Sequence, residues 1–291
     1  MKLDGHIHME TADNTSGELL EKLRQGGLDG GIILSPCPGS FPMGAENTGF
    51  DFRLTAVLEF CRAHPRLYPF FWIDPLEPDA ADQVIEAVKR GIRGFKIICN
   101  AFYPGDEKAL ALYRLMARHQ KPLLFHSGIL WDGTDSSKYN RPVGFEALLN
   151  VEGLKFTLAH MSWPWCDECF AVYGKFLSAY TIDPQGRSEI FLDITPGTPR
   201  IYREEALTKL FGMGCDVADN VIFGTDCPAH DYSVAWAGEW IARDEAIMDK
   251  LGVSSQEKSK VFADNLLRFL GETDVVKTYT KLSPVQEVPQ K

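Results

Sequence analysis

Short apolar segments recur along the chain and alternate with longer stretches that have helical spacing. Residues rich in β-branched and aromatic side chains predict eight strands, at 2–8, 30–35, 67–74, 92–99, 122–127, 154–160, 190–195 and 220–226. The clearest helices between them are predicted at 17–27, 52–64, 79–91, 107–120 and 204–214. Alternating strands and helices imply a parallel sheet, and eight such units imply an α/β fold of the (β/α)8 TIM-barrel type.

An open, doubly wound sheet is the structural alternative to a closed barrel. That fold would need fewer strands, or a glycine-rich phosphate loop after the first strand, and residues 8–17 (HMETADNTSG) are not such a loop. The helical pattern of residues 254–271 begins with a serine of the kind that caps helices. We therefore predict one barrel domain over residues 1–271, followed by an extended C-terminal tail over residues 272–291.

The chain is acidic, with a formal net charge of -10 over 291 residues, and 45% of its residues are hydrophobic. A nucleic-acid backbone and an anionic membrane surface both repel an acidic protein, so neither is the expected partner. No apolar run approaches the roughly 18 residues of a membrane-spanning helix, and the N-terminus lacks the pattern of a signal peptide. We expect a cytoplasmic protein that acts on a small molecule, with a homo-oligomer left open.

Seven cysteines are spread along the chain without the density of a disulfide scaffold, so reduced thiols are expected. Cys166 and Cys169 form a CxxC pair, which is typical either of a redox site or of half a zinc site. The sequence contains no second CxxC, and no thioredoxin-like pattern surrounds this one. We interpret both cysteines as ordinary residues on a helix face.

Polar side chains stand where several of the predicted strands end, in place of the apolar residues expected there. They are His6 and His8 on the first strand, Lys96 on the fourth, His126 on the fifth, His160 on the sixth and Asp226 on the eighth. Each alone has an ordinary interpretation, such as a hydrogen-bonded histidine or an aspartate that caps a turn. Together they obey one positional rule, because the carboxyl ends of the strands meet at one mouth of a barrel. Imidazole and carboxylate groups are preferred ligands of zinc and similar ions, so a metal site is the simplest common cause.

The first predicted strand concentrates these side chains within LDGHIHME, residues 3–10. Successive side chains of a strand point to opposite faces, so Asp4, His6 and His8 are expected to share one face. Leu3 and Ile7 are expected on the other face. Two imidazoles at this spacing can reach a single ion.

The same residues resemble a known family. DGHIH near the start, a lysine on the fourth strand, single histidines that end the fifth and sixth strands, and FGTDCP on the eighth are similar to the amidohydrolase superfamily. The resemblance is to its amidohydrolase-related branch (family 2), which includes enzymes similar to aminocarboxymuconate-semialdehyde decarboxylase. It extends over residues 4–270 and includes VFADNLLRFLG, which is similar to the final helix of that branch. The CxxC pair is not part of the family pattern.

This resemblance implies a ligand set and a catalytic group for this chain. The implied metal ligands are His6, His8, His126 and Asp226. They would bind one divalent metal ion, with Zn²⁺ foremost and Mn²⁺, Fe²⁺ or Co²⁺ as alternatives. His160 is implied to stand beside the ion as a catalytic group. Asp226 is implied to be catalytic as well, because it would accept the proton of the attacking water.

Two further residues have supporting roles under this resemblance. Asp4 is implied to hold the histidines of the first strand, or the floor of the barrel, in position. Some superfamily members carry a carbamylated lysine on the fourth strand that bridges two metal ions, whereas this branch generally uses one ion and an unmodified lysine. We therefore expect a single ion and an unmodified Lys96.

Two reactions are open for such a site. In the hydrolase hypothesis, which we place first, a zinc-activated water attacks a small substrate that is carboxylated or cyclic. In the alternative hypothesis, a metal-dependent decarboxylase of the aminocarboxymuconate-semialdehyde decarboxylase type releases carbon dioxide. A third hypothesis is a metal-binding or regulatory protein without activity.

Substrate contacts are expected from cations and aromatic residues near the mouth of the barrel. Lys96, Arg200 and Arg203 are the available cations for a substrate carboxylate. Trp163 is a candidate wall of a pocket for a ring, and the aromatic residues Trp131, Trp165 and Tyr202 lie in the same loops. The loops at 36–50 and 128–142 follow strands at the end where barrel enzymes build their active sites.

Overall fold

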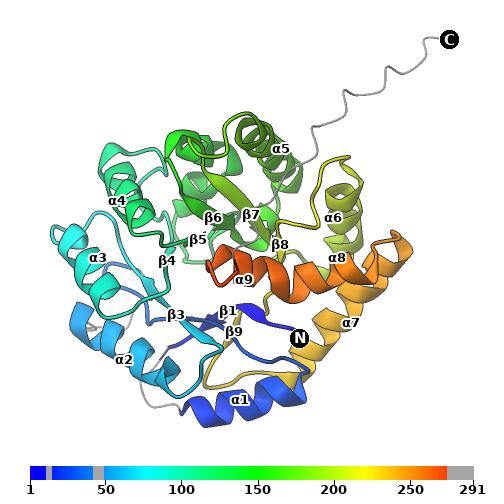
Figure 1. The fold of residues 1–291 in the computed structure, drawn as a ribbon, viewed down its shortest axis with the longest axis horizontal. Helices are drawn as coiled ribbons and strands as arrows, with labels where there is room; N and C mark the ends of the chain where they lie inside the picture. Colours follow the sequence, from blue (N-terminus) through cyan, green and yellow to red (C-terminus); the bar gives the residue numbers. More distant parts are fainter. Residues whose placement is uncertain (11–14, 42–48, 274–291) are drawn as a thin grey trace.

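The described chain forms a barrel of parallel strands surrounded by helices, as Figure 1 shows. The computed structural model describes residues 1–10, 15–41 and 49–273. The strands are β1 (Asp4–His8), β2 (Gly31–Leu34), β3 (Leu67–Trp72), β4 (Gly94–Ile97), β5 (Leu123–Phe125), β6 (Lys155–Leu158), β7 (Glu189–Asp193), β8 (Val221–Ile222) and β9 (Cys227–Pro228). Their order in the sheet is β8-β7-β6-β5-β4-β3-β2-β1-β9, and every neighbouring pair is parallel.

Helices pack around the outside of this barrel. The α-helices are α1 (Ser16–Gln25), α2 (Phe50–Arg62), α3 (Ala80–Lys89), α4 (Glu107–Arg118), α5 (Cys166–Ile182), α6 (Arg200–Gly212), α7 (Val234–Lys250), α8 (Ser255–Ser259) and α9 (Asn265–Phe269). Short 3₁₀ helices lie at Ser136–Asn140, Pro142–Asn150 and Ala159–Ser162, and a π-helical turn, Lys260–Asp264, joins α8 to α9. Cys166 and Cys169 lie in the first turn of α5 as free thiols.

The eighth strand closes the barrel in two pieces. β8 pairs with β7 and β9 pairs with β1, and residues 223–226 separate the two pieces. Within this interval the Gly5 amide donates to the Phe223 carbonyl at 2.8 Å, and the Asp226 amide donates to the His6 carbonyl at 2.9 Å. One continuous segment therefore joins the last strand of the barrel to the first, which confirms the predicted (β/α)8 architecture.

The C-terminal helices close the end of the barrel at which the strands begin. Ser254 and Glu257 form a capping box at the start of α8. Leu266 and Phe269 of α9 then pack against the apolar side chains that fill the barrel interior, and full burial of such a side chain stabilises the fold by about 1.5 to 3 kcal/mol. The Leu3 amide donates to the Phe262 carbonyl at 2.7 Å. In Figure 1 this orange and red segment crosses the centre of the barrel, which leaves the opposite end for the site.

Strand β1 departs from simple alternation. Leu3 packs in the interior cluster, whereas Ile7 belongs to the outer cluster between strands and helices. The pairing register with β2 shifts between Asp4 and Ile7, and an irregularity of this kind re-aims side chains. The expectation that Leu3 and Ile7 share a face is therefore wrong, whereas His6 and His8 both reach the same cavity.

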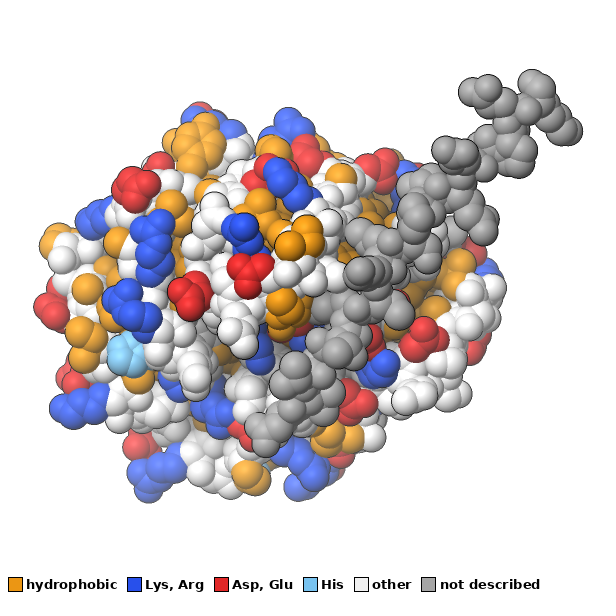
Figure 2. All heavy atoms as spheres, turned by 45° about the horizontal axis from the view of Figure 1, so that its top comes forward, with side chains coloured by type: hydrophobic (Ala, Val, Ile, Leu, Met, Phe, Trp, Pro, Cys, Tyr) orange, Lys and Arg blue, Asp and Glu red, His pale blue; other side chains and the backbone are white. Residues whose placement is uncertain are grey.

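Charged side chains of both signs are interspersed over the face drawn in Figure 2, with apolar side chains in small groups among them. No helix in the described ranges is long and apolar enough to cross a membrane. Residues 42–48 of the expected loop at 36–50, and residues 274–291 of the expected tail, lie outside the described residues. The division between domain and tail at residue 271 stays a prediction.

Candidate metal centre and active site

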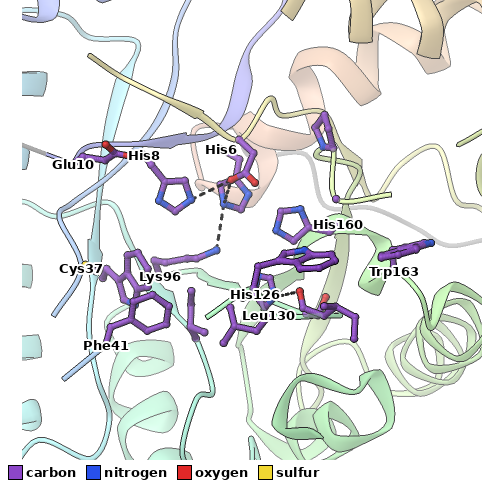
Figure 3. A pocket seen from close by; sticks show the side chains of 18 of the residues that line it. His6, His8, Glu10, Cys37, Phe41, Lys96, His126, Leu130, His160 and Trp163 are labelled. Atoms are coloured by element: carbon purple, nitrogen blue, oxygen red, sulfur yellow. Dashed lines mark hydrogen bonds and ion pairs between the residues drawn. The ribbon is translucent and has the colours of Figure 1, made fainter. Parts of the chain in front are cut away.

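The polar side chains expected at the strand ends line one cavity at the carboxyl end of the barrel. They are His6, His8, Lys96, His126, His160 and Asp226. Figure 3 shows the imidazoles of His6, His8 and His160 and the amine of Lys96 directed toward a common region. The cavity has a volume of about 690 Å³, which lies in the range of roughly 300 to 1,000 Å³ that holds small organic ligands.

His6 on β1 is fixed by an acid that the sequence pattern did not single out. Its Nδ1 atom lies 2.7 Å from Oδ2 of Asp193 at the end of β7, and both side chains are buried. The other carboxylate oxygen of Asp193 accepts hydrogen bonds from the amide and the hydroxyl of Thr195, the amide at 2.6 Å. With its Nδ1 proton donated to Asp193, the imidazole presents the lone pair of Nε2 to the cavity. The signal for Asp193 was an acid inside the otherwise apolar strand IFLDIT.

Burial acts on both members of this pair. It lowers the pKa of His6 well below the ordinary value, and the positive charge of Lys96 lowers it further. It also raises the pKa of Asp193, against the effects of His160, Thr195 and Lys96. Both shifts follow from the cost of holding charge away from water. His6 is therefore a neutral imidazole, which is the form that binds metal.

Asp226 stands in the interval between β8 and β9, with its backbone in the left-handed region at φ 60°. Its Oδ1 atom lies 3.2 Å from Nε2 of His8 and 3.5 Å from Nε2 of His6. Burial alone would raise the pKa of this carboxyl, but the hydrogen bond to His8 and the neighbouring imidazoles lower it below the ordinary value. The carboxylate therefore remains ionised.

His160 follows β6 in a strained stretch of backbone. Residues 160–162 have φ values of 63°, 48° and 57° in the left-handed region, which costs energy for side chains other than glycine. Gly197 makes room for the imidazole, because a Cβ atom at that position would lie 2.6 Å from the Cβ atom of His160. The Nδ1 atom of His160 is buried and has no hydrogen-bond partner among the described residues.

Three of these side chains meet closely enough to share an ion. One donor atom each from His6, His160 and Asp226 lies within 4.8 Å of the other two. Two imidazoles and a carboxylate are a typical donor set for zinc and related divalent ions. The unpartnered nitrogen of His160 points to a ligand that the polypeptide does not itself supply. The residues therefore fit a divalent metal ion.

Lys96 on β4 lies beside His6 in the same cavity. Its Nζ atom is 3.3 Å from Nε2 of His6, and the side chain is buried. Burial lowers the pKa of Lys96 to about 8, while Asp226 and Asp193 act in the opposite direction. The amine therefore lies beside His6 and lines the cavity.

His126 follows β5 and lines the cavity outside the group of three. Its Nε2 atom donates to the Ile129 carbonyl at 3.1 Å, so Nδ1 is the atom left for a ligand. Its ring centroid is 5.1 Å from that of His160. The structure thus places His126 beside His160, and its part as a metal ligand stays a prediction.

Asp4 ties the first strand to the segment that carries Asp226. One carboxylate oxygen accepts from the His6 amide at 3.0 Å and from the Thr225 amide at 2.9 Å. The other oxygen accepts from the Thr225 hydroxyl at 2.6 Å and from the Tyr232 hydroxyl at 2.8 Å. Burial raises the pKa of Asp4 to about 6, although these hydrogen bonds oppose the shift.

The arginines expected near the mouth are not among the described residues that line the cavity. Arg203 is fully buried and binds Asp244 through two hydrogen bonds of 2.8 and 2.6 Å. Arg200 is exposed and pairs with Glu239 at 2.8 Å. Trp163 does line the cavity, with its ring 6.2 Å from that of Tyr202.

An apolar wall faces the polar floor. Phe41, Trp72 and Ile98 form one buried cluster, with Leu130 packed against it. The Phe41 and Trp72 rings are 4.9 Å apart, and the Trp72 ring is 5.8 Å from the His8 imidazole in an edge-on arrangement. A flat, apolar part of a ligand can rest on such a wall while its polar groups reach the floor.

Comparison with known proteins identifies the family. A family model described as Amidohydrolase matches residues 45–271. The chain belongs to the amidohydrolase family. This amidohydrolase is accordingly an enzyme, and the resemblance stated from the sequence motifs is confirmed. The matched range begins after β1, so the two histidines of that strand lie outside it. No sequence match was found among curated proteins.

Solved structures of low sequence identity share the fold of this amidohydrolase. A probable 2-pyrone-4,6-dicarboxylic acid hydrolase from Acinetobacter baumannii is 16% identical, with a TM-score of 0.64 over 93% of this chain and 99% of that chain. A 2,6-dihydroxybenzoate decarboxylase from Rhizobium is 13% identical, with a TM-score of 0.65 over 93% of this chain and 98% of that chain. A dihydroorotase from Campylobacter jejuni is 17% identical, with a TM-score of 0.58 over 95% of this chain and 84% of that chain.

Proposed function

We propose that this amidohydrolase is a metal-dependent hydrolase that acts on a small carboxylated or cyclic substrate. The observation that carries the proposal is the convergence of His6, His160 and Asp226, whose donor atoms lie within 4.8 Å of one another at the floor of a cavity. We propose His6 and Asp226 as ligands of the ion and His160 as the group that stands beside it. These donors come from β1, from the turn after β6 and from the interval between β8 and β9. Only the folded barrel brings them together.

His6 and Asp226 are the proposed core of the metal site, and His8 and His126 are proposed to complete it. A divalent ion bound there, zinc foremost, would lower the pKa of water and offer positive charge to a developing oxyanion. Asp193 holds the His6 ring in the orientation that presents Nε2. Asp4 holds the backbone of both β1 and Thr225. The protein thus fixes the donors before a substrate enters.

Asp226 and His160 are the proposed proton-transfer groups. Asp226 is ionised, so its carboxylate can accept a proton from the attacking water. His160 is buried, and burial lowers the pKa of its imidazole to about 4. The neutral imidazole can donate one hydrogen bond to the substrate or accept a proton from it. His160 is therefore placed to polarise a carbonyl or to serve the leaving group.

The charge of the cavity limits the substrate. Among the described residues that line the cavity, Lys96 is the only lysine or arginine. Together with the apolar wall, one cation favours a substrate that has one carboxylate and a flat apolar part.

Decarboxylation is the second candidate function, and the same cation and wall favour it. An aromatic carboxylate resting on Trp72 and Phe41 could direct its carboxylate toward Lys96. Loss of carbon dioxide would then require a proton at the vacated carbon, which His160 or an adjacent acid would have to deliver. Both reactions would use the same residues, so hydrolysis and decarboxylation can be distinguished only by their products.

The experiment is a product assay with a panel of cyclic amides, lactones and aromatic carboxylates. The enzyme is loaded with zinc, and acid release and carbon dioxide release are measured in parallel. Acid without carbon dioxide supports hydrolysis, and carbon dioxide supports the second candidate. Equal rates for the wild type and the Asp226→Asn variant would contradict both.

A further inference from the structure

A second recess lies at the opposite end of the barrel from the candidate active site. It has a volume of about 850 Å³ and is lined by residues at the beginnings of β5, β6 and β7 and at the end of α9. Gly91, Gly153 and Gly271 are among the residues that line it, and a Cβ atom at any of the three would meet nothing within 4 Å. The recess therefore has open space beside these three glycines.

The charge of this recess is opposite to that of the whole chain, whose net charge is -10. The described charged residues that line it are Arg93, Lys121, Lys155, Arg268 and Glu189. Arg268 pairs with Glu189, and Arg93 pairs with Glu272. Among the described residues that line the recess, these two ion pairs leave a surplus of two lysines.

Neither surplus lysine has a carboxylate within ion-pair distance among the described residues. The Lys155 ammonium donates to the Arg268 carbonyl at 2.8 Å. The Lys121 side chain has neither a hydrogen bond nor an ion pair in the described part of the chain. An ammonium that loses water without gaining an anion is destabilised.

The surroundings of both lysines disfavour the charged form of the ammonium group. Burial lowers the pKa of Lys121, and the positive charge of Arg93 lowers it further. Burial also lowers the pKa of Lys155, partly offset by Glu189. A bound anion would supply the missing opposite charge to both groups.

We propose that this recess binds a small anion with two or more negative charges, of phosphate or polycarboxylate type, between Lys121 and Lys155. Charge-assisted hydrogen bonds from two ammonium groups suit such an anion better than a single-charged one. A local basic recess on an acidic protein also concentrates anions there. The site faces away from the metal centre, so this proposal does not depend on the proposed function.

Binding at this recess would connect three parts of the fold. Lys121 belongs to the loop before β5, Lys155 begins β6, and Arg268 lies on the helix that closes the barrel. An anion bound in the recess would therefore stabilise the closed end of the barrel. The stabilisation would rise with anion concentration, because the ligand binds the folded state.

The test is isothermal titration calorimetry of the full chain with inorganic phosphate and, separately, with citrate, at an ionic strength held constant with sodium chloride. We expect a binding event that the Lys121→Gln/Lys155→Gln variant weakens at least about tenfold, the loss expected from one or more charged hydrogen bonds. Any further event, at the active-site cavity, should be the same in the wild type and in this variant. The preference between phosphate and citrate identifies which of the two anion types the recess takes. A parallel measurement of the thermal midpoint without anion shows that the variant is folded.

The control variant is Lys89→Gln/Lys175→Gln, which removes the same charge from two lysines with side-chain exposures of 76% and 51%. It should bind like the wild type. The proposal is overturned if neither anion binds the wild type at millimolar concentration. It is overturned equally if the recess variant binds as tightly as the control, since the anion then lies elsewhere.

Discussion

The Nδ1 atom of His6 lies 2.7 Å from Oδ2 of Asp193, and this hydrogen bond joins the first strand of the barrel to the seventh. It sets which nitrogen of His6 faces the cavity. Asp193→Asn should lower metal affinity or kcat/KM by about 10- to 100-fold, the usual effect of losing such a supporting carboxylate. Zinc titration and steady-state kinetics measure the two effects. Asp82→Asn, on the exposed face of α3, is the control, and equal behaviour of both variants would contradict the role of Asp193.

Gly197→Ala should displace His160. The added Cβ atom would lie 2.6 Å from the Cβ atom and 2.7 Å from the Cγ atom of His160. A displacement of about 1 Å can cost roughly 100-fold in rate, so we expect kcat to fall by about that factor while the protein stays folded. Gly212→Ala is the matched control, because a Cβ atom there meets nothing within 4 Å. Unchanged kcat in Gly197→Ala would show that the position of His160 does not matter for the reaction.

His126 and His160 should respond differently to substitution. We expect His126→Asn to lose metal, because His126 is a proposed ligand, and His160→Asn to retain metal while its activity falls by about 10²- to 10⁴-fold. Elemental analysis of both purified variants, beside activity, separates the roles. The opposite result, with metal lost only in His160→Asn, would assign His160 to the ligand set. It would agree with the close grouping of His6, His160 and Asp226.

The barrel and most residues at its mouth could be predicted from the sequence. In a barrel of parallel strands, a residue at the carboxyl end of any strand lies at the mouth, so each residue can be placed from its own strand alone. His126 and His160 each follow an apolar run, and His6 lies on the first predicted strand, so their common placement needs only the strand assignment. Asp193 was not singled out, because it stands inside the strand predicted at 190–195, whereas in the structure β7 already ends at this residue. Its importance comes from His6, which is 187 positions away in the sequence.

Arg203 was predicted to lie at the site, but the structure places it elsewhere. Its position after the seventh strand suggested a substrate contact, but its side chain turns into the protein and meets Asp244, which lies 41 positions further along the chain. Arg203 also donates to the Ile194 carbonyl at 2.6 Å, and its guanidinium lies 5.0 Å from the centre of the Trp240 ring. Nothing in the spacing of α6 distinguishes a residue that faces α7 from one that faces the mouth. Such pairings depend on how two helices pack.

Arg203→Met should destabilise the protein by about 3 to 5 kcal/mol, because it leaves the buried Asp244 carboxylate without its partner. Urea denaturation measures the change in the free energy of unfolding. The double variant Arg203→Met/Asp244→Leu should recover much of the loss, since removing both charges also removes the cost of burying them. A double variant that is as unstable as Arg203→Met would contradict this explanation.

Lys96→Met should weaken binding of substrates that carry a carboxylate. A hydrogen bond to a charged group is worth about 1.5 to 3 kcal/mol, which corresponds to roughly a 10- to 150-fold rise in KM. An uncharged analogue, such as the methyl ester of the same substrate, should show a much smaller rise. A comparable rise for both compounds would mean that Lys96 does not bind the carboxylate.

The metal content of purified wild-type, His6→Ala and Asp226→Ala proteins tests the central claim most directly. Inductively coupled plasma mass spectrometry should find about one divalent ion per chain in the wild type and a large loss in both variants, with circular dichroism showing that all three are folded. A wild type that binds no divalent ion even after incubation with zinc, manganese, iron or cobalt would contradict the account. Variants that retain the full complement of metal would contradict it as well.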